Sequence, residues 1–398
     1  MNLARIKELK RCVVPLKNRT LVRVSGKDSV KFLQGLTTNN LTRLSDNQNT
    51  HASIYTGFLA STGRLLFDAI VSLEKQSTTT TSTASTTAAT ASDSNSATHS
   101  YIVDVDSAVA DKVFEHLKFY KMRDKVTIED ATQHYSVMSV LDKTYKTIRN
   151  DKLFEHLEEE QCSVMMDPRH DNMGIRILVP NSKTSIAKKD LFSTYSEEDE
   201  ELYHLYRLQN GIPEGLKDYN YNTVIPLEYN FDLLNGVDFH KGCYLGQELT
   251  SRTHYTGLIR KRIFPVTMKA KDEHVYPKED HLLFSPYVLN SLNINTPPSD
   301  TELKVTMKNK GANSPFTDKE QDGPSPSSTP APSAGRSTEK FISGRQNVGL
   351  AMIKVEHIDA GDFKHTIIKD KESRQLQLLE PCWWGKVVGI VVPTQQVS

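Results

Sequence analysis

The chain has 398 residues, in which 49 lysines and arginines balance 49 aspartates and glutamates, and it contains 4 cysteines. This length allows two or three domains, and the zero net charge argues against a global electrostatic attraction to nucleic acid or to an anionic membrane. No apolar run approaches the ~18 residues of a membrane-spanning helix. The cysteines are too widely spaced for a disulfide framework or a paired zinc site, so we expect a reducing compartment.

Residues 1–16 form a basic segment that is poor in acids. Its apolar residues Leu3, Ile6, Leu9 and Val13 recur at roughly helical spacing. A basic amphipathic start of this kind is typical of a mitochondrial targeting segment, but an ordinary basic first helix has the same pattern. Both interpretations stay open.

Residues 17–134 predict an N-terminal α/β module. Its insertion at 76–99 consists almost entirely of serine, threonine and alanine, which bury too little apolar surface to fold. Because loop-closure entropy grows slowly with length, we interpret it as a disordered, expanded hairpin loop. Strands are expected at 19–26, 64–75, 100–106 and 124–131, and helices at 27–41 and 107–122.

Residues 135–260 predict a second α/β module. Strands are expected at 134–142 and 174–180, followed by a helix that Gly211 and Pro213 end.

From 261 to 398 helical periodicity gives way to short strands, which predict a small C-terminal β-barrel with Trp383 and Trp384 in its core. The proline- and serine-rich insertion at 308–340 is expected to be disordered. The whole chain is therefore expected to be an α+β protein. The barrel strands are expected at 262–268, 281–286, 302–307, 347–355 and 386–393.

The stretch HKGCYLGQELTSRTHYTG, residues 240–257, holds Cys243 between two glycines and ahead of a predicted helix at 247–255. A helix amino terminus and the neighbouring Lys241 would both lower the pKa of the thiol. Cys243 is then a thiolate able to contact iron or a cluster, or else a small buried apolar residue in a tight turn. Because an iron–sulfur cluster usually takes four cysteines, a lone thiol that contacts a cluster needs further ligands from a partner chain or a small molecule. Cys12, Cys162 and Cys382 are interpreted as inert.

Two stretches, RLQNGIPEG (207–215) and IPLEYNFDLLNGVDFHKGCYLGQELTSRTHYTGLIRKR (225–262), resemble the signature of the YgfZ-type folate-binding proteins. These are relatives of the aminomethyltransferase (T-protein, GcvT) of the glycine cleavage system. The core pattern of the family is K-G-C-Y-x-G-Q-E, followed by an arginine, a glycine and a basic pair. It is matched by Lys241, Gly242, Cys243, Tyr244, Gly246, Gln247, Glu248, Arg252, Gly257, Lys261 and Arg262.

The resemblance implies an aminomethyltransferase-like ring of α/β (ferredoxin-like) modules and a barrel, around a cavity that holds tetrahydrofolate. Asp68 and Glu214 are candidates to bind the pterin, and the basic side chains are candidates for the glutamyl tail or for an acidic partner. Each has a simpler reading: Asp68 as a solvent-facing acid, RLQNGIPEG as a loop that stops a helix, and the basic run at 260–262 as a solvated face. The expected cofactor-binding residues are Asp68, Arg207, Glu214, Lys241, Gln247, Glu248, Arg252, Arg260 and Arg262.

The resemblance further implies an accessory factor of the mitochondrial matrix that matures [4Fe–4S] proteins with A-type scaffold proteins. The clients would be aconitase-type and radical-SAM enzymes, with no permanently bound metal, no nucleic acid and no membrane span. The alternative is a folate-dependent one-carbon transferase. The aminomethyltransferases carry two adjacent acids where this chain has Phe67 and Asp68, and the missing acid argues against glycine-cleavage activity.

Overall fold

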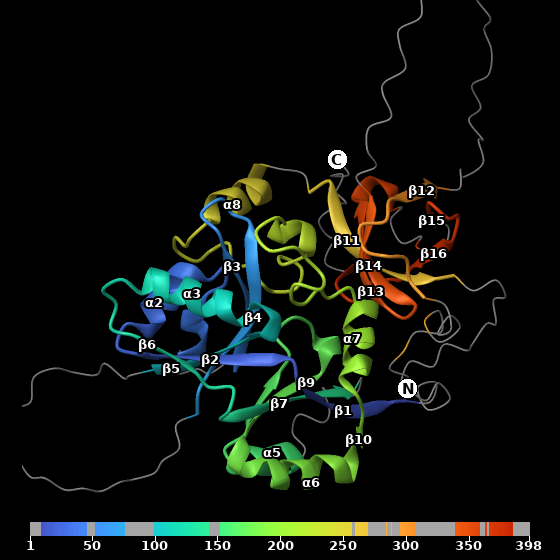
Figure 1. Ribbon diagram of the computed structural model, residues 1–398. Coiled ribbons are helices and arrows are strands. Elements are labelled where there is room, and N and C mark those ends of the chain that lie inside the picture. The colour runs from blue at the N-terminus through green and yellow to red at the C-terminus, as the bar shows by residue number, and fades with distance from the viewer. Residues whose placement is uncertain are drawn as a thin grey trace, which may run out of the picture.

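The computed structural model describes residues 9–45, 52–75, 99–142, 152–256, 259–269, 284, 288, 295–307, 339–358, 363 and 366–384. The predicted insertions at 76–99 and 308–340 lie almost wholly outside these residues, as do the first eight residues and the strands expected at 281–286 and 386–393. Three sheets make up the described part, arranged around a central region (Figure 1).

The first sheet is antiparallel, and helices cover one of its faces. Successive side chains of a strand point to opposite faces of the sheet, so alternate residues can pack against the helices while their neighbours face the other side. Phe67, Ala69 and Val71 pack against the helices, whereas Ile70 faces the middle of the molecule. Its strands, in sheet order, are β3 (Ser53–Leu59), β4 (Leu65–Leu73), β5 (His99–Asp106), β2 (Arg19–Gly26) and β6 (Thr127–Asp130), and its helices are α2 (Ser29–Leu36) and α3 (Ala110–Lys121).

The second sheet repeats this plan, with helices on its outer face. Val13, Met138 and Ile177 pack towards those helices, whereas Val14 and Val137 join the central core. Its strands, in sheet order, are β10 (Ser196–Glu197), β1 (Arg11–Leu16), β7 (Tyr135–Asp142), β9 (Ile175–Pro180) and β8 (Ser163–Met166), and its helices are α5 (Lys152–Glu159) and α6 (Thr184–Thr194).

The strand β1 corrects the expectation of a helical start for residues 11–16. These residues are extended and pair antiparallel with β7, with Val13 opposite Val140. The run CVVPL explains the result, since it is a short apolar segment with buried side chains on both faces. The interpretation of the first eight residues as a targeting segment lies outside the described part, and the domain boundaries stay a prediction.

The third sheet is the predicted C-terminal barrel. Its two edge strands approach each other, because Glu302 forms a bridge with Lys340 and the Leu303 amide donates to the Glu339 carbonyl at 3.0 Å. Trp383 is fully buried and packs on Phe264, as expected for the barrel core. Its strands, in sheet order, are β12 (Leu303–Met307), β15 (Thr366–Asp370), β16 (Gln375–Leu378), β11 (Lys261–Met268), β14 (Val348–Lys354) and β13 (Lys340–Arg345).

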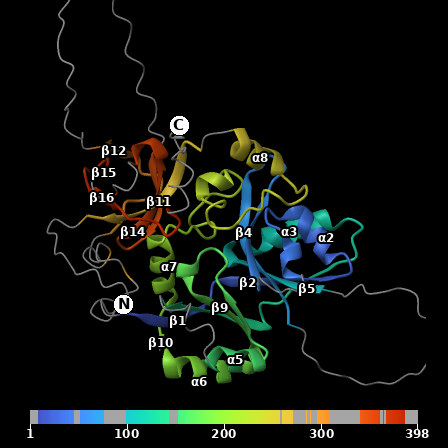
Figure 2. The same ribbon diagram turned by 180° about the vertical axis from the view of Figure 1, so that it is seen from behind.

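Helix α7 (Glu200–Gln209) lies between the second sheet and the barrel, as Figure 2 shows from behind. From Leu202 to Gln209 every residue is buried, and Gly211, with a φ of 72°, ends the helix as the sequence predicts. The inner faces of both sheets, α7 and the barrel thus share one core. The predicted α+β ring with a C-terminal barrel is confirmed.

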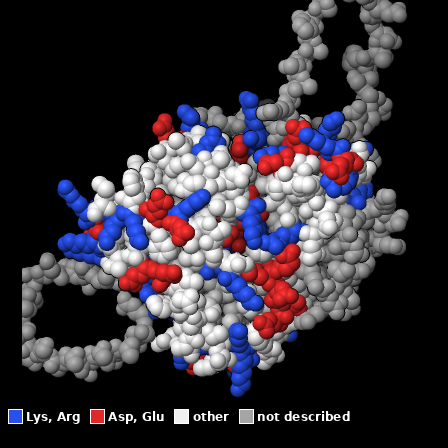
Figure 3. All heavy atoms as spheres, in the orientation of Figure 1, with Lys and Arg blue, Asp and Glu red and all other residues white. Residues whose placement is uncertain are grey.

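The surface in Figure 3 carries basic and acidic side chains interspersed over the described residues of that face. No helix among the described residues is long and apolar enough to cross a membrane.

Candidate functional site

The KGCYLGQE motif lies on a loop that packs against the first sheet and leads into α8 (Gln247–Thr256). The Leu245 amide donates to the Gly35 carbonyl at 2.9 Å, and the Asp238 amide donates to the Thr38 carbonyl at 3.1 Å. Gly246 has a φ of 76°, and a Cβ there would lie 2.3 Å from the Ala60 carbonyl oxygen. A side chain at this position would therefore push the loop off the β3–β4 turn.

Lys241 fixes the other side of the same loop. Its buried ammonium donates to three backbone carbonyls at the end of α2 and beyond it, those of Gln34 at 2.7 Å, Thr37 at 2.5 Å and Asn39 at 3.0 Å. Burial lowers the pKa of Lys241 to about 7, and the nearby charge of Asp238 opposes this shift. The three N–H donors of Lys241 are thus used within the fold and none is left for a folate, while the predicted effect of its charge on the thiol stays a prediction.

Cys243 lies between these two anchors, and its side chain is exposed. It is not a buried filler residue. Helix α8 begins only at Gln247, so Tyr244, Leu245 and Gly246 separate the thiol from the first turn. The thiol therefore lies outside the helix itself, and its predicted activation by α8 stays a prediction.

The other predicted residues of the motif lie on α8 and around the start of β11. Gln247 is half-buried, and Glu248, Arg252 and Arg260 are exposed. Arg262 is buried and binds Asp232 at 2.7 Å and the Leu227 carbonyl at 2.8 Å. Arg262 therefore ties the barrel to the preceding loop and has no free face for a folate tail.

Asp68 lies far from the thiol in sequence and deep in the central region. It is buried, and its Oδ1 accepts hydrogen bonds from the Tyr219 hydroxyl and from the Gly215 amide at 3.0 Å. Burial and the charge of Glu214 raise the pKa of Asp68 above its ordinary value. The simpler reading of Asp68 as a solvent-facing acid is wrong. Phe67 points the other way and stacks on Phe58, so an acid at position 67 would be buried among aromatic rings.

Glu214 sits in a buried ion network at the same centre. Its Oε2 accepts from Arg169 at 2.5 Å and from the Tyr203 hydroxyl at 2.6 Å, and its Oε1 lies 3.3 Å from Arg19. Burial alone would raise the pKa of Glu214, but the surrounding arginines outweigh it and hold that pKa well below its ordinary value. Arg207 is paired in the same way with Asp218.

Sequence reasoning missed the partners that complete this network. Asp104 accepts from Arg19 at 2.6 Å and from Arg176 at 2.5 Å, so β2, β5 and β9 meet through one carboxylate. A signal was present, since Asp104 in YIVDV and Arg176 in GIRILVP are each flanked by apolar residues within a strand. A charge buried in a sheet needs a partner, and each of these strands supplies one.

The residues proposed for folate fit that ligand poorly in this arrangement. Glu214 and Arg207 spend their hydrogen bonds on internal partners. Two buried polar atoms, the Tyr55 hydroxyl and Nη1 of Arg176, have no partner among the described residues. A polar ligand at the centre would therefore have Asp68 and Tyr55 to contact, but neither Glu214 nor Arg207 without breaking an ion pair.

Comparison with known proteins finds relatives that align with most of the chain. The chain is 50% identical over 414 aligned residues, spanning 100% of both chains, to "Iron-sulfur cluster assembly factor IBA57 homolog, mitochondrial" of Dictyostelium discoideum. It is 36% identical to "Iron-sulfur cluster assembly factor IBA57, mitochondrial" of Mus musculus over 64% of this chain and 65% of the mouse protein. A homolog from Mycosarcoma maydis is 29% identical over 86% of this chain and 73% of its own.

Two further matches concern the fold. Residues 260–386 match the "CAF17, C-terminal beta-barrel domain". The crystal structure of glycine cleavage system aminomethyltransferase T from Bartonella henselae aligns with a TM-score of 0.58 over 94% of this chain and 86% of that one. At 10% sequence identity this likeness shows a shared fold.

Proposed function

The chain belongs to the IBA57 family of mitochondrial iron–sulfur cluster assembly factors, and we propose that it acts in the mitochondrial matrix on the late maturation of [4Fe–4S] proteins. The observation that carries this proposal is the exposed Cys243 on a loop fixed by Lys241 and Gly246. A thiol held this way is presented to a partner without reorganisation of its loop.

The cluster is cargo in this proposal, not a resident cofactor. Among the described residues, no group of three or more His, Cys, Asp or Glu side chains gathers to hold a metal ion. One thiol supplies one ligand, so an iron–sulfur cluster at Cys243 takes its remaining ligands from a second protein. We propose an A-type scaffold protein as that partner, and aconitase-type and radical-SAM enzymes as the clients.

Aromatic side chains beside the motif support a protein contact there. His254 of α8 stacks on Phe239 with ring centroids 3.6 Å apart, and the neighbouring Tyr255 is 65% exposed. Exposed aromatic residues are enriched at protein interfaces. A scaffold that brings a cluster to Cys243 would meet these rings on the same loop and helix.

The test is a transfer reaction. A cluster-loaded A-type scaffold is mixed anaerobically with the chain, and absorbance and Mössbauer spectra are recorded for wild type, Cys243→Ser and Gly242→Ala. Gly242→Ala is a matched control, because a Cβ there meets no atom within 4 Å and the thiol stays in place. We expect a new cluster signal with wild type and Gly242→Ala but not with Cys243→Ser.

The same variants are then compared in cells at equal abundance. Normal activity of [4Fe–4S] clients with Cys243→Ser would show that the thiol is not the working group. In that case the proposal would have to be abandoned.

For tetrahydrofolate we propose a restricted role, as a ligand near Asp68 and Tyr55 that is not needed for cluster transfer. The support is the buried acid with its raised pKa and the unpartnered Tyr55 hydroxyl in the same core. Titration of the chain with tetrahydrofolate checks this, and Asp68→Asn should weaken binding while cluster transfer persists. Loss of transfer in a folate-free preparation would contradict the restricted role.

The alternative, a one-carbon transferase, is favoured by the shared aminomethyltransferase fold alone. Asp68 lacks a second acid beside it, since Phe67 faces the opposite side of β4. Release of methylenetetrahydrofolate from an aminomethyl donor would establish the transferase, and we expect none.

A further inference from the structure

A cavity of about 490 Å³ lies between the first and second sheets, and none of its lining residues belongs to the motif or to the central network. Its walls come from β2, the end of β4, β5, and the region of β7 to β9. Glu74 in its wall is six residues beyond Asp68, which corresponds to roughly 20 Å along an extended strand. The volume falls within the roughly 300–1,000 Å³ of small-molecule sites, so the cavity is large enough for a ligand of its own.

Among the eleven described residues that line it, Glu74 alone is acidic, and its carboxylate is already satisfied. Oε1 accepts from Arg23 at 2.6 Å and from the Tyr135 hydroxyl at 2.6 Å, and Oε2 accepts from the Ser100 hydroxyl at 2.5 Å. Burial opposes ionisation, but these bonds lower the pKa of Glu74. A cation entering the cavity would therefore find no free carboxylate.

Several polar groups of the lining have hydrogen-bonding capacity left for a ligand. The side chains of Gln161, Ser163 and Ser182 have no hydrogen-bond partner among the described residues. Lys75 donates once, to the Cys162 carbonyl at 3.0 Å, and its ammonium lies 3.8 Å from the exposed Glu158. An ammonium has three N–H groups, so donors remain for a ligand.

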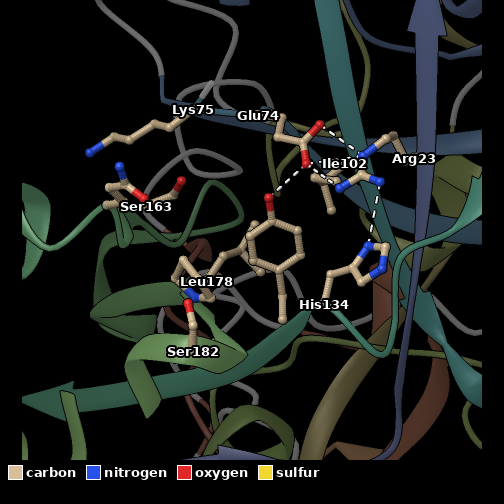
Figure 4. Close-up of a pocket in the computed structure, with 11 residues that line it drawn as sticks. Arg23, Glu74, Lys75, Ile102, His134, Ser163, Leu178 and Ser182 are labelled. Carbon is tan, nitrogen blue, oxygen red and sulfur yellow. Dashed lines mark hydrogen bonds and ion pairs between the residues drawn. The ribbon is translucent and has the colours of Figure 1, made fainter. Parts of the chain in front are cut away.

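The opposite side of the cavity carries Arg23 and His134, as Figure 4 shows. Nη1 of Arg23 lies 3.4 Å from Nδ1 of His134. An arginine only donates, so Nδ1 accepts and the imidazole proton of a neutral His134 lies on Nε2. That nitrogen is one more donor. Arg23 also lies 3.6 Å from the exposed Glu129, at the rim.

The lining also contains apolar surface. Ile102 of β5 and Leu178 of β9 are only 1% and 3% exposed, so the accessible apolar surface comes mainly from the half-buried Pro180 and the ring of Tyr135. A bare inorganic anion would leave this surface without a contact. A ligand that uses the whole lining combines negative charge with a hydrocarbon body.

We propose that this cavity binds a small organic carboxylate, with its charge at Lys75 and Ser163 and its hydrocarbon body against Pro180 and the ring of Tyr135. The ligand would contact residues of both modules at once, because Lys75 belongs to the first and Ser163 and Pro180 to the second. Binding would therefore stabilise the contact between the modules.

The experiment measures binding of succinate, glutarate and benzoate to the full chain, by calorimetry at constant ionic strength, with inorganic phosphate in parallel. Lys75→Gln removes the cation but keeps a polar side chain. Lys183→Gln is the matched control, because that lysine pairs with Glu160 at 2.7 Å and does not line the cavity. Ser163→Leu fills the cavity without changing charge.

We expect saturable binding of at least one carboxylate, at least tenfold weaker in Lys75→Gln and in Ser163→Leu, and unchanged in Lys183→Gln. The midpoint of thermal unfolding should rise with ligand for wild type and not for Lys75→Gln. The site would be refuted by no saturable binding below ~10 mM, by equal weakening in both lysine variants, or by phosphate binding as tightly as the carboxylates. Cys243→Ser should bind the carboxylate normally, so failure here and failure of the proposed function are separate results.

Discussion

At the scale of single residues, the four cysteines differ in what they can reach. Cys12 and Cys162 are 0% exposed, and burial raises the pKa of Cys162 to about 11. Cys382 is half-buried and its thiol lies 3.2 Å from the Asn210 carbonyl. Cys243 is exposed. Chemistry that depends on solvent access therefore separates Cys243 from the other three.

This difference predicts the order of alkylation. In the native protein at pH 7.5, N-ethylmaleimide should modify Cys243 first, by at least tenfold over Cys12 and Cys162, because a buried thiol reacts only after local opening. Peptide mass spectrometry over time measures it. Cys243→Ser should lose the fast phase, and a fast phase that survives in this variant would contradict the assigned exposure.

The functional roles that the sequence suggests for Cys243 and Asp68 stay predictions, whereas the internal contacts of Lys241 and Arg262 could not be predicted from it. The partners of these two side chains lie far from them along the chain. Lys241 donates to carbonyls of residues 34–39, which carry no side-chain signal in the sequence. Arg262 pairs with Asp232, and a basic run gives no sign of which member turns inward. A family pattern marks such residues as important without separating binding from packing.

At the scale of elements, two glycines hold α8 against the β3–β4 turn. Gly63 has a φ of 79° and Gly246 a φ of 76°, and a Cβ on Gly63 would lie 3.0 Å from the Gly246 carbonyl oxygen. The two backbones meet at a distance that only glycine permits. Gly242, in contrast, has open space around it, so the two glycines flanking the thiol are not equivalent.

Gly246→Ala and Gly242→Ala should therefore behave differently. We expect Gly246→Ala to cost about 2–4 kcal/mol of unfolding free energy, from a left-handed φ combined with a backbone clash. Gly242→Ala should change it by less than about 0.5 kcal/mol. Urea unfolding followed by circular dichroism gives both values. Equal effects would mean that the loop does not rest on the β3–β4 turn.

Helices and strands were predicted correctly where the hydrophobic period and the length of the segment both indicated the same element. The strands around Arg19–Gly26 and Leu65–Leu73 and the helix Ala110–Lys121 follow from clear alternation or amphipathic spacing. For residues 11–16 the expected helix is wrong, because helical spacing of a few apolar residues can arise by chance, while the local run CVVPL pairs in a sheet. Short apolar runs do not distinguish strand from helix, and a strand's partner is not visible locally.

At the scale of the whole molecule, buried charges join the modules. Asp104 and Glu214 lie among Arg19, Arg169 and Arg176, which come from both sheets. Removing one member of such a network leaves a buried charge without compensation. The junction therefore depends on ionisation as well as on apolar packing.

This network predicts acid lability. The pKa of Glu214 is well below its ordinary value in the folded chain, so its contribution to stability is complete above pH ~4.5 and is lost as the pH falls below that value. The pKa of Asp68 is raised in the folded chain, so protonation of Asp68 favours the folded state as the pH falls. Glu214→Gln should cost roughly 3–5 kcal/mol at pH 7.

Urea unfolding between pH 7 and pH 3.5 provides the measurement. Between pH 4.5 and 3.5, Glu214→Gln should lose stability less steeply than wild type, because the titrating group is absent. Parallel curves for the two proteins would show that Glu214 is not the group responsible.

The position of β1 has a consequence for how the chain acquires its shape during synthesis. Val13 leaves the ribosome early, yet its neighbours across the sheet are Val140 on one side and Glu197 on the other. The nascent chain must therefore carry an apolar, unpaired ribbon until most of both modules have emerged. We expect molecular chaperones that shield extended apolar segments to bind this first strand. A circular permutant that begins at β2 and carries β1 behind β10 would shorten the time for which β1 stays unpaired.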